Sequence, residues 1–296
     1  MRIAVTGKSG QVVNALIERG GAAGHDVIAL GRPDMDLSDP ASVACALEAA
    51  APDVVVSAAA YTAVDKAEGE AELAHAVNGA GAGAVARAAR ALGVPVIHVS
   101  TDYVFDGTLD RPYRESDPTG PTGVYGASKL AGEQAVLAEH GDNAAILRVA
   151  WVYSPYGANF VKTMLRVAGD RDEVSVVADQ VGNPTSALDI ADGILLVAAN
   201  LTASDDPALR GVFHMTARGE ASWADFAQAI FAASASVGGP SATVRRITTA
   251  DYPTSATRPA NSRLDCARIA AVHGVTLPDW QGALTTVVTR LQAASS

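Results

Sequence analysis

The sequence has little cysteine and no long apolar run. Cys45 and Cys266 are its only cysteines among 296 residues, and they lie far apart without metal-ligand spacing. This excludes a disulfide framework and a cysteine zinc site, so we expect two reduced structural thiols. No apolar run reaches the ~18 residues that a transmembrane helix needs. The first residues, MRIAVTG, do not have the pattern of a signal peptide, and we expect a cytoplasmic protein.

Positive charge is also scarce. Lysine and arginine total 22 against 32 acidic residues, which gives a net charge of -10 and a pI of about 5.0. This balance disfavours a nucleic-acid or membrane partner. An anionic ligand can still bind at a helix N-terminus. With 49% hydrophobic and 18% charged residues, the composition is typical of a folded globular protein.

The first half of the chain alternates short β-branched runs with longer alanine-rich segments. The expected strands are 2–6, 26–30, 53–59, 95–100 and 144–150. The expected helices are about 10–20, 40–50, 70–92 and 124–140. Nearly continuous apolar strands suit a sheet that is buried on both faces. The order predicts the α/β class, with a Rossmann-type doubly wound parallel sheet.

After Trp151 loops become frequent, which indicates a second, smaller unit. A helix at about 186–200 and a strand at 211–217 are expected to return to the sheet. The predicted dinucleotide-binding domain is therefore 1–150 plus about 184–217. Residues 151–183 and 218–296 would form a discontinuous substrate-binding lobe, with the ligand in the crevice between the two parts.

The segment VTGKSGQVV follows the first strand and opens the first helix. Gly7 and Gly10 have the spacing of a pyrophosphate-binding turn, although the third glycine of that pattern is Val13. A P-loop is excluded, because the glycine it needs five residues before Gly7 is Arg2. The alternative is a plain glycine turn, but the position between strand and helix favours a dinucleotide site.

The end of the second strand bears on the choice between NADPH and NADH. An acidic residue there would hold the ribose hydroxyls of NADH, but the chain has Gly31 and Arg32. An arginine suits a 2′-phosphate, so we expect NADPH, with NADH as the alternative if Arg32 is only a solvated loop residue. Asp36 is expected near the adenine.

Polar residues follow the third and fourth strands. Small residues, Ala58 to Ala60, would let a cofactor pass close to the backbone beside Tyr61 and Thr62. HVSTDYVFDG would place Ser100, Thr101 and Asp102 in the crevice. The alternative for such side chains is loop or helix capping.

Tyr125 and Lys129 are four residues apart in VYGASKLAGE, and thus share one helical face. A phenol beside an ammonium is a plausible acid–base unit, because the positive charge favours the phenolate. An isolated pair of this kind also occurs by chance on ordinary helix surfaces.

Seven segments in this order resemble the extended short-chain dehydrogenase/reductases, and within them most closely the dTDP-4-dehydrorhamnose reductase family. They are TGKSGQV, AAAYTAVDKAE, STDYVFDG, VYGASKLAGE, LRVAWVY, DQVGNPT and RPANSRLD. The resemblance implies reduction of the 4-keto group of dTDP-4-dehydro-6-deoxy-L-mannose to dTDP-L-rhamnose. It also implies roles for Tyr125 as proton donor, Lys129 as partner of the nicotinamide ribose and Thr101 as carbonyl ligand.

The resemblance and the motifs together give two sets of binding residues. The expected cofactor set is Gly7, Gly10, Gln11, Val12, Arg32, Asp36, Leu37, Ala60, Tyr61, Thr62, Tyr125 and Lys129. The expected substrate set is Thr101, Asp102, Tyr125, Trp151 and Arg258, with Gln180 and Asn183 as weaker candidates. For Trp151 the alternative is a core residue that packs the two lobes together.

The resemblance is incomplete at the acidic residues that bind Mg²⁺ between subunits in some members of the family. The matching positions hold Ala15 and, near the second, Leu188, although Glu18 or Asp189 could compensate. We therefore assign no metal ligand, leave Mg²⁺ open and expect a monomer or weak homodimer. Three other functions remain open: another nucleotide-4-ketosugar reductase, a 4-epimerase that retains NAD, and a non-catalytic regulatory subunit of the same fold.

Overall fold

A six-stranded parallel sheet forms the centre of the computed structural model, which describes residues 1–294. Its spatial order is β10-β5-β4-β3-β1-β2. The strands are β1 (Arg2–Thr6), β2 (Asp26–Leu30), β3 (Val54–Ser57), β4 (Val96–Thr101), β5 (Ala144–Val149) and β10 (Gly211–His214). The four inner strands are almost wholly buried, as their apolar runs require. The predicted Rossmann-type fold is confirmed.

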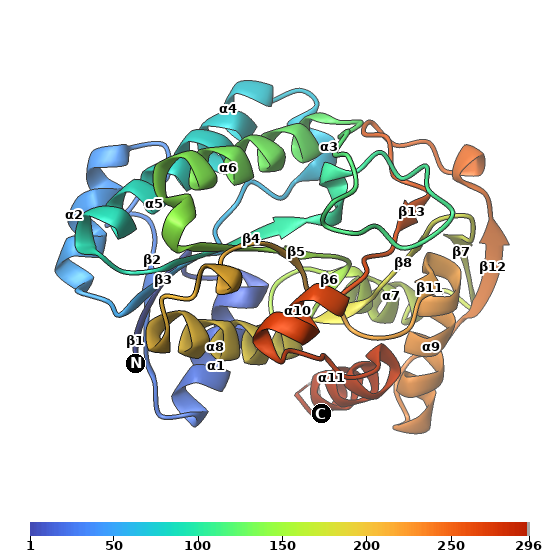
Figure 1. The fold of residues 1–296 in the computed structure, drawn as a ribbon. Coiled ribbons are helices and arrows are strands. Elements are labelled where there is room, and N and C mark those ends of the chain that lie inside the picture. Colours follow the sequence, from blue (N-terminus) through green and yellow to red (C-terminus); the bar gives the residue numbers. More distant parts are fainter. Residues whose placement is uncertain (295–296) are drawn as a thin grey trace.

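Helices cover both faces of this sheet (Figure 1). On one face lie α1 (Gln11–Ala22), α8 (Ala187–Ala203) and α10 (Ala267–His273), which share an apolar core with the sheet. On the other face lie α2 (Pro40–Ala50), α5 (Gly81–Leu92) and α6 (Val124–His140). These two cores fix the carboxyl ends of the strands along one edge, where an open α/β sheet binds its ligand.

Two sequence expectations need correction within this domain. The helix expected at 70–92 is three consecutive pieces, α4 (Ala71–His75), a π-helical segment Ala76–Ala80 and α5, and a short α3 (Val64–Ala67) precedes it. The strand expected at 211–217 ends at His214, because residues beyond it leave the sheet for the C-terminal part.

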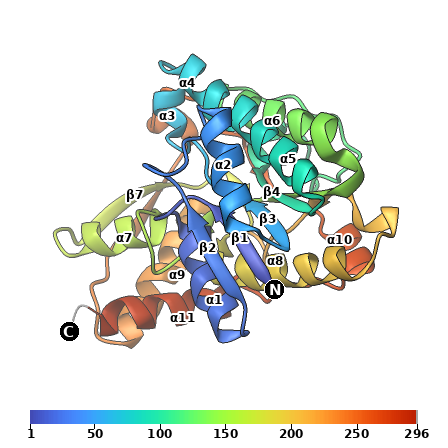
Figure 2. The same cartoon turned by 90° about the vertical axis from the view of Figure 1, so that its left-hand side faces the viewer.

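The C-terminal part gathers at one end of the sheet around its own apolar core (Figures 1 and 2). Its helices are α7 (Phe160–Ala168), α9 (Trp223–Ser236) and α11 (Trp280–Ala293). A parallel pair, β7 (Glu173–Val177) with β12 (Thr243–Ile247), lies beside them. The domain boundaries given above stay a prediction.

Short strands and 3₁₀ turns complete the chain between these elements. The strands are β6 (Val152–Tyr153), β8 (Val181–Gly182), β9 (Thr185–Ser186), β11 (Ala221–Ser222) and β13 (Asn261–Ser262). The 3₁₀ turns are Asp102–Val104, Gly141–Asn143, Pro207–Leu209 and Thr249–Asp251.

None of the helices within residues 1–294 has the length and apolar character needed to cross a membrane.

Candidate active site

A cleft of about 1180 Å³ lies at the carboxyl ends of the central strands, between the sheet and the C-terminal part. Its wall contains the whole predicted cofactor set and four of the five predicted substrate residues. These are Gly7, Gly10, Gln11, Val12, Arg32, Asp36, Leu37, Ala60, Tyr61, Thr62, Thr101, Asp102, Tyr125, Lys129 and Trp151. The fold thus brings together side chains that are up to 144 positions apart in sequence (Gly7 to Trp151).

The glycine turn has the shape that a bound diphosphate requires. Gly7 has a φ of 103°, and a Cβ on it would lie 3.1 Å from Val13 Cγ2, so a side chain there would be strained. Gly10 precedes α1 in extended conformation and offers no side-chain cap to the first backbone N–H groups of the helix. Those N–H groups carry the positive end of the helix dipole and suit an anion at this end of the cleft.

Basic side chains stand at the rim next to this turn. Arg32 is exposed and has no hydrogen bond or ion pair to any residue within 1–294, whereas Lys8 is paired with Asp34 at 2.7 Å. The Asp36 carboxylate accepts hydrogen bonds from Ser38 N and Oγ at 2.9 and 2.7 Å, which lower its pKa. The hydrogen bonds of Asp36 thus stabilise the turn in which it lies. Of the two basic side chains, Arg32 is the one available to bind a ligand phosphate.

The loop that follows β3 is held in place by Asn78, a residue that the sequence did not single out. Asn78, in the π-helical segment, accepts a hydrogen bond from Tyr61 N at 2.7 Å and donates to Tyr61 O at 3.1 Å. It also donates to Ser128 Oγ on α6 at 2.9 Å. Asn78 thus links the loop at the cleft wall to the helix of Tyr125 and Lys129. No sequence signal marks it, because a π-helical segment of five residues is too short to leave a repeat in the sequence.

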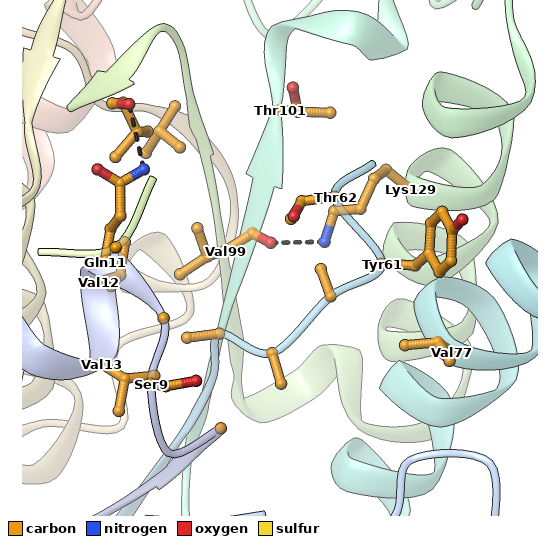
Figure 3. A pocket seen from close by; sticks show the side chains of 18 of the residues that line it. Ser9, Gln11, Val12, Val13, Tyr61, Thr62, Val77, Val99, Thr101 and Lys129 are labelled. Carbon is orange, nitrogen blue, oxygen red and sulfur yellow. Dashed lines mark hydrogen bonds between the residues drawn. The ribbon is translucent and has the colours of Figure 1, made fainter. Parts of the chain in front are cut away.

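Lys129 is buried and reaches from α6 towards β4 (Figure 3). Its Nζ donates to Val99 O at 2.8 Å and lies 3.4 Å from His98 Nε2. Burial lowers the pKa of Lys129 to about 8, and the nearby Glu133 partly opposes this shift. The ammonium is therefore retained at neutral pH and lost above about pH 8.

Tyr125 stands half-buried on the same face of α6, edge-on to Tyr103 with 5.4 Å between the ring centres. Burial and the Asp102 carboxylate raise the pKa of Tyr125 above its ordinary value, while a side-chain hydrogen bond with Thr101 lowers it. Lys129 is not among the groups that shift this pKa, and its Nζ donates to Val99 O and lies 3.4 Å from His98 Nε2, so the expected lowering by Lys129 and the nicotinamide stays a prediction. The phenol thus stays protonated near neutrality, the form that can donate a proton.

Asp102 is a buried carboxylate at the end of β4. Its Oδ1 accepts from Thr101 Oγ1 at 3.0 Å, and its Oδ2 has no hydrogen bond of normal geometry within residues 1–294. Burial raises the pKa of Asp102 to about 6, against smaller opposing contributions from Ser262 and Thr101. A buried oxygen without a partner is costly, so its place in the cleft wall fits a ligand hydroxyl that would satisfy it.

An aromatic wall closes the opposite side of the cleft. Trp151, in the left-handed region with a φ of 48°, stacks on Trp223 with ring centres 3.6 Å apart. Gly182 makes room for the indole, because a Cβ there would lie 2.5 Å from it. The ring of Phe160 lies beside that of Trp223, with 4.6 Å between the ring centres. The rings of Trp151, Trp223 and Phe160 all line the cleft. Trp223 was missed from the sequence, since it stands at the start of an ordinary amphipathic helix.

Trp151 combines the two interpretations given for it. Its indole packs against the apolar core of the C-terminal part and against a smaller cluster around Phe105 and Tyr113, and it also faces the cleft. A non-glycine residue with positive φ is uncommon and strained, and such strain is concentrated at functional sites.

Three weaker candidates lie outside the residues that line the cleft. Arg258 is paired with Asp65 at 2.6 Å. Gln180 donates to Thr249 Oγ1 at 3.0 Å, and Asn183 donates to Gly219 O at 2.6 Å. These contacts are an ion pair and loop hydrogen bonds, and the predicted substrate role of Arg258 stays a prediction.

The positions considered for a metal do not form a cluster. Ala15 and Leu188 are buried apolar residues, and Glu18 binds Arg290 through two hydrogen bonds of 2.8 and 2.7 Å. Asp189 has one buried oxygen that forms no hydrogen bond of normal geometry with any residue the structure describes. Within residues 1–294 no group of three or more histidine, cysteine or acidic side chains could hold a metal ion.

Known proteins resemble this chain over nearly its full length. Residues 1–293 match the family model described as RmlD substrate binding domain. A dTDP-4-dehydrorhamnose reductase of Sinorhizobium fredii (strain NBRC 101917 / NGR234) is 52% identical over 281 residues, which cover 95% of this chain and 94% of the relative.

Solved structures agree over nearly the full length. A dTDP-4-dehydrorhamnose reductase of Clostridium acetobutylicum has a TM-score of 0.91 and 35% identity, covering 99% of this chain and 100% of that one. A dTDP-4-dehydrorhamnose reductase of Bacillus anthracis, solved in complex with NADP, has a TM-score of 0.89 and 34% identity, covering 98% and 99%.

Proposed function

The chain belongs to the RmlD substrate binding domain family, and from this we propose that it reduces dTDP-4-dehydro-6-deoxy-L-mannose to dTDP-L-rhamnose with NADPH. It is an oxidoreductase that acts on a nucleotide-sugar ketone. The observation that carries the proposal is the single cleft wall that holds the glycine turn, Thr101, Tyr125 and Lys129.

Different residues of the cleft would bind different groups of the coenzyme. Gly7 and Gly10, with the N-terminus of α1, would hold the diphosphate, because this is where backbone N–H groups and the helix dipole meet an anion. Arg32 would pair with the 2′-phosphate, and Lys129 would donate to the nicotinamide ribose. Bound NADPH supplies the hydride for the reaction.

Tyr125 is proposed as the proton donor. As hydride reaches C4 of the sugar, the carbonyl oxygen gains negative charge and takes the phenolic proton, so the ketone becomes a secondary alcohol and the tyrosine a phenolate. The raised pKa of Tyr125 keeps the proton available before this step. Thr101, whose hydroxyl donates to Asp102 Oδ1 at 3.0 Å and which lowers the pKa of Tyr125, would orient the carbonyl oxygen.

The substrate side is assigned to Asp102 and the aromatic wall. Asp102 Oδ2, which has no hydrogen bond of normal geometry among the described residues, would accept a hydrogen bond from a sugar hydroxyl. The faces of Trp151 and Trp223 would cover the apolar hydrogens and the C6 methyl group of a deoxysugar and exclude water from the reacting carbon.

One assay tests this proposal against its alternatives. The 4-keto sugar nucleotide is generated enzymatically, the protein is added with NADPH or NADH, and the product is identified by NMR. We expect stoichiometric oxidation of NADPH and dTDP-L-rhamnose as the product. A C4 epimer of rhamnose would indicate another 4-ketosugar reductase.

Two other outcomes would replace the proposal by a different function. Turnover without coenzyme oxidation would identify a 4-epimerase. Binding of the sugar nucleotide without any turnover would identify a non-catalytic subunit of the same fold.

A further inference from the structure

Behind Lys129 lies a buried pair of polar side chains that the proposed mechanism does not use. His98 on β4 and Ser57 on β3 are each 1% exposed, and they lie on neighbouring strands paired Ser57 with His98. His98 Nδ1 is 3.1 Å from Ser57 Oγ, and His98 Nε2 is 3.4 Å from Lys129 Nζ. A continuous contact thus runs from the interior of the sheet to the cleft wall.

The chemistry of the three groups fixes the direction of this contact. An ammonium has only donors, so His98 Nε2 must accept, and the ring proton must sit on Nδ1, where it donates to Ser57 Oγ. A charged imidazole would place two cations together. Burial and the charge of Lys129 lower the pKa of His98 well below its ordinary value, which agrees with a neutral ring.

The ammonium of Lys129 has three N–H donors. One is taken by Val99 O at 2.8 Å, and a second is directed at His98 Nε2, both on the β4 side. One donor is left for a ligand in the cleft that Lys129 lines. Without His98 the ammonium would keep one anchor and could rotate about it.

We propose that His98, with its tautomer held by Ser57, is a positioning residue that fixes the Lys129 ammonium so that its third N–H points to the coenzyme. This inference rests on the proposed function, in which Lys129 contacts the nicotinamide ribose. The alternative is that His98 only fills space in the sheet, where Ile97 and Val99 flank it.

The test is a double-mutant cycle between His98 and Lys129. The dissociation constant of NADPH, from nicotinamide fluorescence, and kcat are measured for the wild-type protein, His98→Leu, Lys129→Met and the double variant. His98→Leu is expected to weaken coenzyme binding and to lower kcat, each about tenfold, in the wild-type background. In the Lys129→Met background the same change should alter coenzyme binding less than about twofold, because it acts through the missing ammonium.

Two further variants separate positioning from packing. His98→Gln retains an acceptor near the place of Nε2 and should recover most of the loss, whereas a residue that only fills space would not be rescued by a polar amide. His273→Leu is the matched control, since His273 is buried in α10 and does not line the cleft. It should change the dissociation constant of NADPH less than twofold.

Equal losses from His98→Leu in both backgrounds, or no loss in the wild type, would overturn the inference. If His98→Leu does not fold, Ser57→Ala takes its place in the cycle, with an expected loss of about threefold that vanishes beside Lys129→Met. The binding measurement needs no sugar substrate. Failure of the protein to reduce any 4-keto sugar would therefore contradict the proposed function, whereas an additive cycle would contradict only the role of His98.

Discussion

At the scale of single residues, Tyr125 and Lys129 share a face of α6, but the protein directs them to different neighbours. Lys129 contacts Val99 and His98, whereas the pKa of Tyr125 responds to Asp102 and Thr101. The i, i+4 spacing predicted that the two residues would line one site. It could not predict the direction of the tyrosine pKa, which depends on burial by segments distant in sequence.

Replacement of Tyr125 by phenylalanine is expected to remove most turnover and to leave coenzyme affinity nearly intact. The change deletes only the transferable proton, and a positioned acid is typically worth about 10²–10⁴-fold in rate. Single-turnover reduction and coenzyme titration measure the two effects. Tyr252→Phe, on an exposed tyrosine, is the control and should behave as wild type. Near wild-type single-turnover rates in Tyr125→Phe would exclude this residue as the proton donor.

The pH dependence of kcat/KM for the keto sugar should follow Lys129. Its pKa of about 8 means that the ammonium is lost as pH rises through 8, so kcat/KM is expected to fall about tenfold per pH unit above that value. The fold itself should not weaken there through this group, because a buried lysine with a lowered pKa costs stability in its charged form. Melting temperatures over the same range are the control. A flat profile to pH 10 with the fold intact would show that the charge on Lys129 is not needed.

Replacement of Arg32 by alanine is expected to weaken NADPH binding much more than NADH binding. Arg32 is exposed and forms no hydrogen bond or ion pair with a described residue, although its charge acts on Asp36. A charge-assisted contact to a 2′-phosphate contributes about 1.5–3 kcal/mol. Dissociation constants for both coenzymes give the comparison, with Arg171→Ala as a control on an exposed arginine outside the cleft wall. Equal losses for NADPH and NADH would exclude contact with the 2′-phosphate.

Among the helices and strands, the central strands were predictable because a buried parallel strand appears in the sequence as a continuous run of apolar residues. The runs at β1, β3, β4 and β5 are apolar on both faces, and their bounds differ from expectation by a few residues at most. The π-helical turn Ala76–Ala80 and the two-residue strands have no such record. They are set by tertiary contacts, such as the hydrogen bonds of Asn78.

The candidate site divides in the same way. Motif spacing predicted the residues that follow the strands, because strand ends converge at one edge of the sheet. Trp223 and Asn78 were not predicted, since each becomes part of the cleft wall or its support only when a distant element folds over. Trp151 was predicted from its place after β5, but its stacking on Trp223 required the structure.

The buried pair between β5 and α6 should be important for stability. Arg148 and Glu133 are 4% and 2% exposed and joined by two hydrogen bonds of 2.9 and 2.7 Å. Arg148→Met leaves the Glu133 carboxylate buried without its counter-charge, and we expect a loss of about 3–5 kcal/mol in the free energy of unfolding.

An exposed ion pair that also involves a glutamate of α6 is the matched control. Arg87 on α5 pairs with Glu139 on α6 at the surface, and Arg87→Met should cost at most about 1 kcal/mol. Urea unfolding of the two variants gives both values. Similar losses in the two variants would show that the buried pair contributes no more to the free energy of unfolding than an exposed one.

At the scale of the whole molecule, an acidic protein is proposed to bind two anionic ligands. The net charge of -10 opposes this at long range, so coenzyme binding must depend on local groups, namely the N-terminus of α1 and Arg32. Hydrogen bonds join the two parts: Gln11 on α1 donates to Val152 O at 3.3 Å in the cleft wall, and Glu18 binds Arg290 on α11. The sequence predicted two parts with a crevice between them, but not these contacts, which join positions up to 272 residues apart.

The central claim is that this protein moves a hydride from NADPH to C4 of the sugar. Its most direct test uses NADPH deuterated at both C4 positions of the nicotinamide, with the enzymatically generated 4-keto sugar nucleotide and NMR of the product. We expect dTDP-L-rhamnose carrying one deuterium at sugar C4, with one equivalent of NADPH oxidised. A product without deuterium at C4, or sugar turnover with the coenzyme unchanged, would contradict it.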